Sequence, residues 1–334
     1  MKNKYAIGID IGGTETKFGI IKYKDKTNFV LEHWWSIKTF CGQKNVEHML
    51  DTIVNQVKRI KKLKSIKFDV CGVAVAALLD FYNGDIIYAP NLMWEKFELK
   101  NLLEKKLGLP VVVDNDANLA TLGIFYDKIK SEYPKVQNII CFTLGTGIGG
   151  GVVYQGELLH GGTFSAAELG HITVEPEGDF CGCGNKGCLE RHIGARWFIE
   201  NIIKELKNKK VKTILYKLVN NKLNNLTTKN LYVAAEKNDK YSLDKWKLYG
   251  KYLGIAISDL VNIFAPEIVV FTGGVANAYK FFLPYTINEV KNRVWPVIKN
   301  VQHPLLQNIK YEVVAGQHYG VTGAGILAIK TFLL

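Results

Sequence analysis

Residues 5–23 read YAIGIDIGGTETKFGIIKY, and this stretch decides the fold. An apolar strand ends at Asp10, a turn with two adjacent glycines follows, and a second strand covers 17–23. The order strand, glycine turn, strand predicts a β-hairpin, not the strand-to-helix turn of a dinucleotide-binding fold. Adjacent glycines let a phosphate approach the backbone N–H groups, and Asp10 could hold a magnesium ion beside donors from Thr14 and Lys17. A plain hairpin in a sheet has the same pattern, so this stretch alone leaves both interpretations open.

Two further glycine turns follow apolar strands. Residues 139–154 read IICFTLGTGIGGGVVY and repeat the order of strand, turn and strand. This repetition indicates two related α/β halves, each beginning with a phosphate-facing hairpin. Residues 267–275 read EIVVFTGGV, and we expect a helix after this glycine pair, where backbone could pack on an adenosine. Three such turns predict that a nucleotide is bound in a cleft between the two halves, with contacts from both sides.

A cluster of polar residues follows the next apolar run. Residues 110–113 (PVVV) predict a buried strand that leads into DNDAN at 114–118. A helix cap explains one or two of these polar residues, but not four within five positions. Phosphoryl transfer to an alcohol uses a carboxylate that orients the hydroxyl and accepts its proton. Asp116 is therefore the candidate catalytic base, and Asn115 is a candidate for binding a neighbouring hydroxyl.

One histidine and three cysteines lie close together between residues 171 and 190. Thiolate and imidazole are the preferred ligands of a tetrahedral zinc ion, and four protein ligands leave no position for water. The pattern therefore predicts a structural zinc site. Glu168 and Glu190 flank it, which suggests a binding site for a molecule rich in hydroxyls. The four candidate ligands are His171, Cys181, Cys183 and Cys188.

A disulfide with a spare thiol is the alternative for this cluster. The other cysteines, Cys41, Cys71 and Cys141, lie far from it in the sequence, and the last two have the apolar neighbours of small buried residues. No secretory signal opens the chain, so we expect a cytoplasmic protein in a reducing compartment, where disulfides are rare. Zinc is therefore favoured over the disulfide.

Composition excludes some classes of partner. The chain has 334 residues, which predicts about two domains. No apolar run approaches the roughly 20 residues of a membrane span, so no membrane partner is expected. The net charge of +12 invites a nucleic-acid hypothesis, but only four of the 43 basic residues are arginine. Base and phosphate recognition favour arginine, and the lysines are scattered, so no nucleic-acid partner is expected.

Taken together, these motifs resemble the ROK family of sugar kinases and sugar-responsive repressors over nearly the whole chain. The stretches that carry the resemblance are DIGGT at 10–14, APNLMW at 89–94, DNDAN at 114–118, LGTGIGGG at 144–151, ELGH at 168–171 and the cysteine cluster ending in Glu190. The resemblance implies a duplicated, actin-like ATPase fold of the α/β class with two domains and an interdomain cleft. It also implies ATP, magnesium and zinc, with a hexose or N-acetylhexosamine as acceptor.

The resemblance also implies roles for individual residues. His171 would use one ring nitrogen for zinc and the other for the sugar, since the two nitrogens are distinct. The residues expected to line the sugar are Asn115, Asp116, Glu168, His171 and Glu190, with Asp116 as the base. Those expected around the nucleotide and its magnesium are Asp10, Gly12, Gly13, Thr14, Lys17, Thr146, Gly147, Gly273 and Gly274.

The sequence departs from the family pattern at two places. Ala76 and Ala77 stand where relatives usually carry a Pro-Gly pair near the sugar. Alanine adds a methyl group and loses easy access to positive φ, so the pocket or the activity could change. Ile124 and Phe125 stand where relatives often have an acid, which is expected to lie away from the chemistry.

The expected architecture is a first domain of residues 1–118, completed by a C-terminal helix over 320–334, and a second domain of residues 119–319. Helices are expected over 118–126, 191–207 and 241–264. The expected function is ATP-dependent phosphorylation of a hexose, glucose at O6 first, with N-acetylmannosamine, N-acetylglucosamine or fructose as alternatives. A sugar-sensing protein without catalysis is the alternative of another class. A repressor is disfavoured because Asp10 follows Met1 by nine residues, without room for a DNA-binding module. Relatives commonly pair, so a homodimer is expected.

Overall fold

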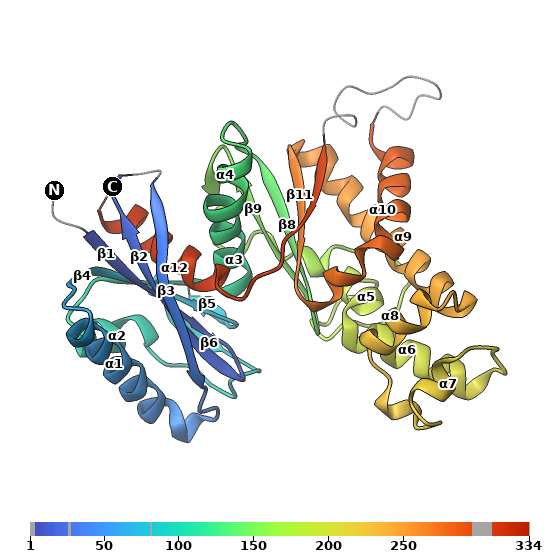
Figure 1. Ribbon diagram of the computed structural model, residues 1–334, viewed down its shortest axis with the longest axis horizontal. Helices are drawn as coiled ribbons and strands as arrows, with labels where there is room; N and C mark the ends of the chain where they lie inside the picture. Colours follow the sequence, from blue (N-terminus) through green and yellow to red (C-terminus); the bar gives the residue numbers. More distant parts are fainter. Residues whose placement is uncertain (1–3, 26–27, 81, 296–308, 334) are drawn as a thin grey trace. The chain divides into compact units, whose positions relative to one another are not determined.

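The computed structural model describes residues 4–25, 28–80, 82–295 and 309–333 (Figure 1). The chain forms two compact units. The first comprises Met1–Gln137, Gly151–Ala166 and Gly316–Leu334, and the second comprises Asn138–Gly150 and Ala167–Ala315. The first unit extends past residue 118 because helix α3 (Asp116–Ile124) packs against helix α12 (Tyr319–Phe332). The predicted domain boundary after residue 118 stays a prediction. The two compact units divide the chain at other residues.

The first unit is built on a five-stranded sheet of order β3-β2-β1-β4-β7. The predicted hairpin over 5–23 is confirmed, since β1 and β2 pair antiparallel and place Asp10 opposite Lys17. Strands β4 and β7 extend the sheet in parallel with β1. The five strands are β1 (Lys4–Ile11), β2 (Glu15–Tyr23), β3 (Phe29–Lys38), β4 (Phe68–Val75) and β7 (Val111–Asn115).

The two faces of this sheet follow from the alternation of side chains along each strand. Ile7, Ile9 and Ile11 belong to one buried cluster with the apolar sides of α1 (Val46–Leu63) and α2 (Leu99–Leu107). The intervening positions of β1 and β4 are mostly small, with Ala6, Gly8, Gly72 and Ala74 among them, and this face contacts α12 instead. Large side chains on one face of the sheet therefore pack against α1 and α2, while small side chains on the other face let α12 approach closely.

Glycines let the backbone of α12 lie directly on the sheet. A Cβ at Gly8 would lie 1.9 Å from the carbonyl oxygen of Val321, and one at Gly72 would lie 1.8 Å from that of Ala324. On α12 itself, a Cβ at Gly323 would lie 1.8 Å from the carbonyl oxygen of Leu119 in α3. Figure 1 shows α12, in red, beside the blue strands. The helix expected near the C-terminus thus packs on the first unit through glycine contacts.

Replacing Gly72 by Ala is expected to destabilise the protein by about 1–3 kcal/mol or more, the usual range for overpacking a close contact. The opposing atom belongs to the backbone of α12, which cannot rotate away as a side chain could. Denaturant unfolding measures the loss. Gly162→Ala is the matched control, because no atom lies within 4 Å of its added Cβ. Equal stability of the two variants would contradict this account of the packing.

The second sheet has the order β10-β9-β8-β11-β12, and the boundary between the two units runs through β9. Strands β8, β11 and β12 pair in parallel. The predicted strand–turn–strand pattern over 139–154 is confirmed by β8 and β9. The strands are β8 (Ile139–Leu144), β9 (Ile148–Tyr154), β10 (Glu157–Leu158), β11 (Ile268–Thr272) and β12 (Lys310–Val313).

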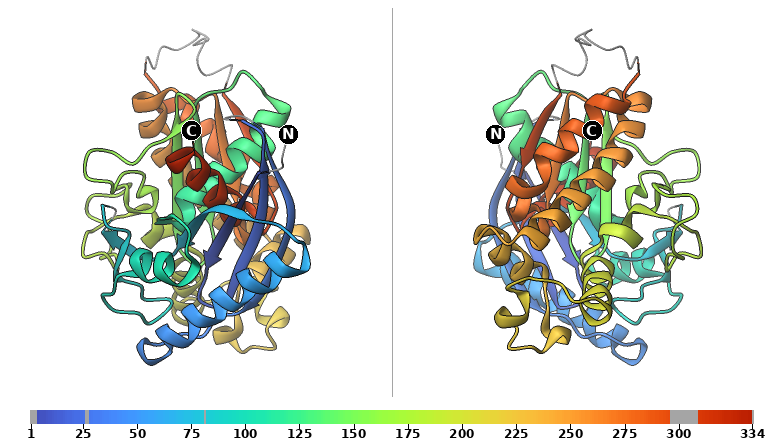
Figure 2. Two further views of the ribbon diagram at one scale, coloured as in Figure 1. Left: turned by 90° about the vertical axis from the view of Figure 1, so that its left-hand side faces the viewer. Right: turned by 90° about the vertical axis from the view of Figure 1, so that its right-hand side faces the viewer.

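The second unit is rich in helices. The predicted helix over 241–264 is confirmed as α9 (Lys240–Phe264), which lies beside α10 (Tyr279–Arg293) (Figure 2). The prediction of a single helix over 191–207 was wrong, because Gly194 separates α5 (Leu189–Ile193) from α6 (Ala195–Asn208). The break occurs because the N–H groups of Ala195 and Arg196 donate to carbonyl oxygens of the glycine turn at 145–146.

The remaining elements are short. The helix expected directly after the glycine pair at 273–274 begins as a 3₁₀ turn, Gly274–Ala278, before α10. The helix expected over 118–126 is α3, continued by a π-helical turn at Phe125–Ile129. The others are β5 (Leu78–Asp80), β6 (Asp85–Tyr88), α4 (Lys130–Glu132), α7 (Leu215–Leu218), α8 (Thr228–Glu236) and 3₁₀ turns at Gln43–Asn45, Leu169–His171 and Leu223–Asn225. None of the helices in the described ranges has the length and apolar character to cross a membrane.

Candidate active site and metal-binding cluster

Two acids come together in the first unit. Asp10 lies at the end of β1, and a Cβ at Gly320 in the first turn of α12 would lie 2.6 Å from its Oδ2. Burial, and then the carboxylate of Asp116, raise the pKa of Asp10 to about 6, while Lys17 opposes the shift. The sheet register places Asp10 opposite Ala74 and Ala74 opposite Asp114, two positions before Asp116, so the two acids form an acidic cluster at one end of the sheet. A divalent cation would suit this cluster.

The first glycine turn is exposed and has a fixed backbone. The N–H of Gly12 donates to the carbonyl oxygen of Glu15 at 3.1 Å, which closes the turn. The carbonyl oxygen of Thr14 accepts from the N–H of Thr39 at 3.0 Å, which ties the turn to the end of β3. Gly13 must be glycine, since a Cβ there would lie 2.8 Å from the carbonyl oxygen of Asn91. The turn therefore presents exposed backbone beside Asp10.

The DNDAN segment forms the junction between β7 and α3. The Oδ1 atom of Asn115 accepts from the N–H groups of Ala117 at 2.8 Å and Asn118 at 3.3 Å. Asn115 is thus the N-cap, so the cap interpretation holds for this one residue. Asp116 follows as the first residue of α3 and is half-buried. The cap fixes the backbone from which Asp116 projects.

Asp114 is an acid of this segment that no sequence pattern distinguishes from its neighbours. Its side chain is buried, and its Oδ2 lies 2.6 Å from Nε2 of His160. Its Oδ1 accepts from the N–H of Asn115 at 2.6 Å and from Nδ2 of Asn118 at 3.2 Å. His160 was missed from the sequence, since it lies 46 residues away in the loop after β10.

The second unit brings the four predicted metal ligands together. One donor atom from each of His171, Cys181, Cys183 and Cys188 lies within 4.8 Å of every other. The Cys181 Sγ to His171 Nδ1 distance is 3.8 Å, and the Cys183 Sγ to Cys188 Sγ distance is 3.7 Å. Ligands about 2.3 Å from a tetrahedral centre stand about 3.7 Å apart, so the spacing and the donor set fit zinc.

The three cysteines of this cluster are free thiols, which contradicts the disulfide alternative. Glycines fold the loop that carries them. Gly184 has φ +92° and Gly187 has φ +66°, both in the left-handed region that favours glycine. A Cβ at Gly187 would also lie 1.7 Å from the carbonyl oxygen of Glu175. The loop is further anchored where the hydroxyl of Tyr252 in α9 donates to Glu175 Oε2 at 3.0 Å.

Glu190 lies against the second glycine turn. Its Oε2 accepts from the N–H of Ile148 at 2.8 Å, and a Cβ at Gly147 would lie 2.2 Å from the same oxygen. Glu190 therefore fixes the turn that contains Thr146, which is itself exposed. Glu168 is also exposed and immediately precedes the 3₁₀ turn that carries His171. In the third turn, Gly273 has φ +93° and packs on the backbone of Leu144.

The predicted residues are thus divided between the units. The first unit contains Asp10, Gly12, Gly13, Thr14, Lys17, Asn115 and Asp116. The second contains Thr146, Gly147, Glu168, His171, Cys181, Cys183, Cys188, Glu190, Gly273 and Gly274. Neither Ala76 nor Ala77 is among the described residues with positive φ, so the backbone there accommodates alanine without strain.

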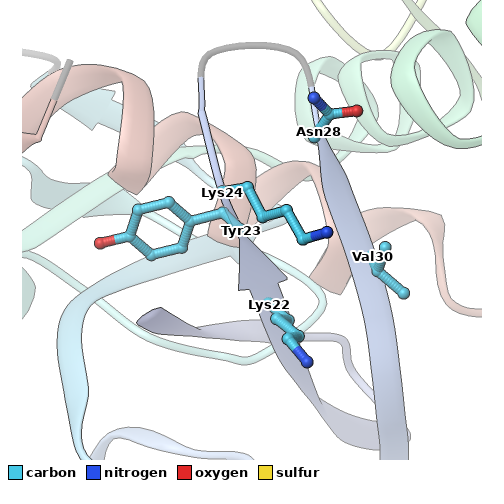
Figure 3. Close-up of a pocket in the computed structure, with 5 residues that line it drawn as sticks. All are labelled: Lys22, Tyr23, Lys24, Asn28 and Val30. Carbon is cyan, nitrogen blue, oxygen red and sulfur yellow. The ribbon is translucent and has the colours of Figure 1, made fainter. Parts of the chain in front are cut away.

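A hollow of about 210 Å³ in the first unit contains none of the predicted residues. It lies at the end of the β1–β2 hairpin opposite the glycine turn, where Tyr23 pairs with Lys4. Figure 3 shows its lining residues, which include two lysines and no acid: Lys22, Tyr23, Lys24, Asn28 and Val30.

Comparison with known proteins decides the family. The sequence profile described as "ROK family" matches residues 6–331. This chain belongs to the ROK family. The ROK protein is similar to a glucokinase of Halalkalibacterium halodurans, with 34% identity over 83% of this chain and 82% of that one. It is also similar to a xylose repressor of Bacillus spizizenii, with 26% identity over 99% of this chain and 79% of the repressor.

A solved structure confirms the predicted fold class of this ROK protein. A ROK family glucokinase from Streptomyces griseus, crystallised with glucose and AMPPNP, superposes with a TM-score of 0.72. The two chains are 27% identical, and the match covers 98% of this chain and 99% of that one. The ROK protein therefore has the actin-like ATPase fold of the α/β class.

Proposed function

We propose that this ROK protein is an ATP-dependent sugar kinase that transfers the γ-phosphoryl group to a hexose, with glucose at O6 as the first candidate. The observation that carries the proposal is that Asp10 and Asp116 lie at the same end of one sheet, next to a glycine turn with exposed backbone. The similarity to glucokinases, one of them crystallised with glucose and an ATP analogue, supports the choice of substrates.

Asp116 acts as the general base in this proposal. Its place at the start of α3 is set by the Asn115 cap, and its own Oδ1 accepts from the N–H of Ala117 at 2.9 Å, which restrains the carboxylate. It orients the sugar hydroxyl and accepts its proton as the phosphoryl group is transferred. Asn115 uses Oδ1 for the cap, which leaves its Nδ2 amide as the donor to a neighbouring sugar hydroxyl. Glu168, His171 and Glu190 complete the proposed sugar site.

The glycine turns bind the nucleotide. Exposed glycine turns suit phosphate oxygens. The N–H of Gly12 closes its turn by donating to Glu15, so Gly12 would shape the turn. The other residues proposed around the nucleotide are Gly13, Thr14, Thr146, Gly147, Gly273 and Gly274. Lys17 would add a cation, and Asp10 would hold magnesium. When bound, magnesium neutralises charge that develops on the phosphates. Asp10 must be ionised for this, and the nearby cation would lower its raised pKa.

Zinc is the proposed occupant of the cysteine cluster. Its four ligands would be His171 through Nδ1, Cys181, Cys183 and Cys188, with no position left for water. When bound, it stabilises the loop between Glu168 and Glu190 and thus the spacing of two proposed sugar ligands. Nε2 of His171 is then available to the sugar.

A panel of hexoses and amino sugars with ATP tests the proposal. We expect ADP production to be fastest with glucose and phosphorus NMR to identify a 6-phosphate ester. Faster turnover of N-acetylmannosamine, N-acetylglucosamine or fructose would change the substrate but keep the sugar kinase. Sugar binding without ADP production would instead favour a non-catalytic sugar sensor, the second candidate. The similarity to a xylose repressor supports that candidate.

A further inference from the structure

A buried carboxylate underlies the junction that presents Asp116. Asp114 is 1% exposed, and both its oxygens have partners. Because a carboxylate accepts hydrogen bonds, the Nε2 atom of His160 is the donor across the 2.6 Å contact with Oδ2. The other oxygen accepts from the backbone of Asn115 and the side chain of Asn118. Oδ1 of Asp114 thus holds Asn115 and Asn118, which lie on either side of Asp116 in the sequence.

His160 connects this junction to a strained loop. The loop is closed by the N–H of Ala166, which donates to the carbonyl oxygen of His160 at 3.0 Å. Within it Phe164 has φ 56°, a conformation that a bulky residue adopts only when its surroundings impose it. The Phe164 ring meets that of Tyr82 edge-on, at 4.9 Å between centroids. The loop is therefore held at His160 and at Phe164.

Charge explains why a histidine suits this position. An ionised carboxylate that is almost fully buried is costly unless it is paired. The hydrogen bond to Asp114 raises the pKa of His160 against the opposing effect of burial, and the Asp114 charge adds to the rise. Asp114 of β7 accepts the hydrogen bond from the imidazole, and Asp116 is the other acid of β7 and α3. His160 thus stays protonated to a higher pH than an exposed histidine.

We propose that His160 is a positioning residue for phosphoryl transfer, which acts through the carboxylate of Asp114 to fix the direction of Asp116. The inference rests on the proposed function, in which Asp116 is the base. If the imidazole is removed, Oδ2 loses its partner and the carboxylate can turn. The bonds from Oδ1 to Asn115 and Asn118 are then weakened, and the start of α3 is free to shift. Small shifts of a general base lower the rate of transfer strongly.

Three substitutions of His160 separate the hydrogen bond from the charge. His160→Gln places a neutral N–H donor near the position of Nε2, whereas His160→Asn is too short to reach it, and His160→Ala removes the donor. For the alanine and asparagine variants we expect kcat about 10- to 100-fold lower, with the KM for ATP within about two-fold of wild type. The glutamine variant is expected to recover most of the lost kcat.

The pH profile adds a readout that a purely structural role would not move. The charged pair is complete below the pKa of His160 in the folded protein and is lost as the pH rises through that raised value. Neutral imidazole has a single N–H, which is shared between Nε2 and Nδ1, so deprotonation weakens the donor to Asp114. We therefore expect wild-type kcat to fall in part over this range on the alkaline side, and the glutamine variant, whose amide N–H does not titrate, to lack that fall. His33→Gln is the matched control, since His33 is exposed on β3, and it should keep the wild-type profile.

Each outcome of these experiments supports or contradicts the positioning role of His160. Thermal melts identify any variant that fails to fold, and Asp114→Asn then serves as the second route, expected to remove the same alkaline fall with His160 intact. An active wild type whose His160→Ala variant keeps its kcat and its pH profile would overturn the inference alone. A wild type that phosphorylates no sugar in the panel would overturn the proposed function, and the positioning role with it.

Discussion

Asp116→Asn is expected to lower kcat about 10²- to 10⁴-fold, the usual contribution of a general base. Asparagine has nearly the same shape as aspartate, so the Asn115 cap and the start of α3 should remain intact. Sugar affinity should therefore change little, because the amide can still contact the hydroxyl but cannot accept its proton. Steady-state kinetics with the best sugar of the panel, together with calorimetry for sugar binding, measures the two effects separately.

The pKa of Asp10 supplies a second measurement on the Asp116→Asn variant. Burial is the main reason that the pKa of Asp10 is raised to about 6, and the Asp116 carboxylate adds to the rise, so Asp116→Asn should lower that pKa in part. Asp51→Asn is the control, since Asp51 is exposed on α1 and pairs with Lys106. Near-normal turnover by the Asp116 variant would remove this residue from the mechanism.

Cys183→Ser is expected to remove zinc from the protein and to weaken sugar binding. Losing a single outer-shell partner already lowers metal affinity by about 10- to 100-fold, and losing a direct ligand should do at least as much. Without the metal, the loop between Glu168 and Glu190 must be ordered when the sugar binds, which lowers affinity. Metal analysis of the purified variant and calorimetry with the sugar measure the two losses.

Cys41→Ser is the matched control for the zinc experiment, because Cys41 is a free cysteine outside the cluster. It should keep the wild-type metal content. Purified wild type with well below one zinc per chain would contradict the proposed site, and so would a Cys183 variant with full zinc content. Treating wild type with a chelator should reproduce the effects of Cys183→Ser without any substitution.

Local patterns explain which parts of the fold were predictable. The hairpins over 5–23 and 139–154 are set by apolar strands with glycines between them, and both are confirmed. The break between α5 and α6 was not predicted, because 191–207 has a helical pattern throughout. That break depends on hydrogen bonds from Ala195 and Arg196 to the distant turn at 145–146. Sequence periodicity carries no information about such a partner.

The candidate site also has parts that could be predicted from the sequence and parts that could not. The metal cluster was predictable because three of its four ligands lie within eight residues of each other, and their spacing is typical of zinc loops. The pairing of His160 with Asp114 was not, since neither residue has a neighbour that marks it and 46 residues separate them. The contact of Glu190 with the turn at Gly147 was hidden for the same reason. Long-range contacts of single side chains need coordinates.

The packing of α12 on the first sheet through glycine contacts has a consequence during synthesis of the chain. Strands β1, β2 and β4 emerge from the ribosome early, but the helix that covers their small-residue face is made only after residue 319. Until then the nascent sheet exposes the apolar surface of Ala6, Ile21 and Val70. Exposed apolar surface on a growing chain promotes aggregation and invites chaperones. We therefore expect the first unit to finish folding only after the second has been translated.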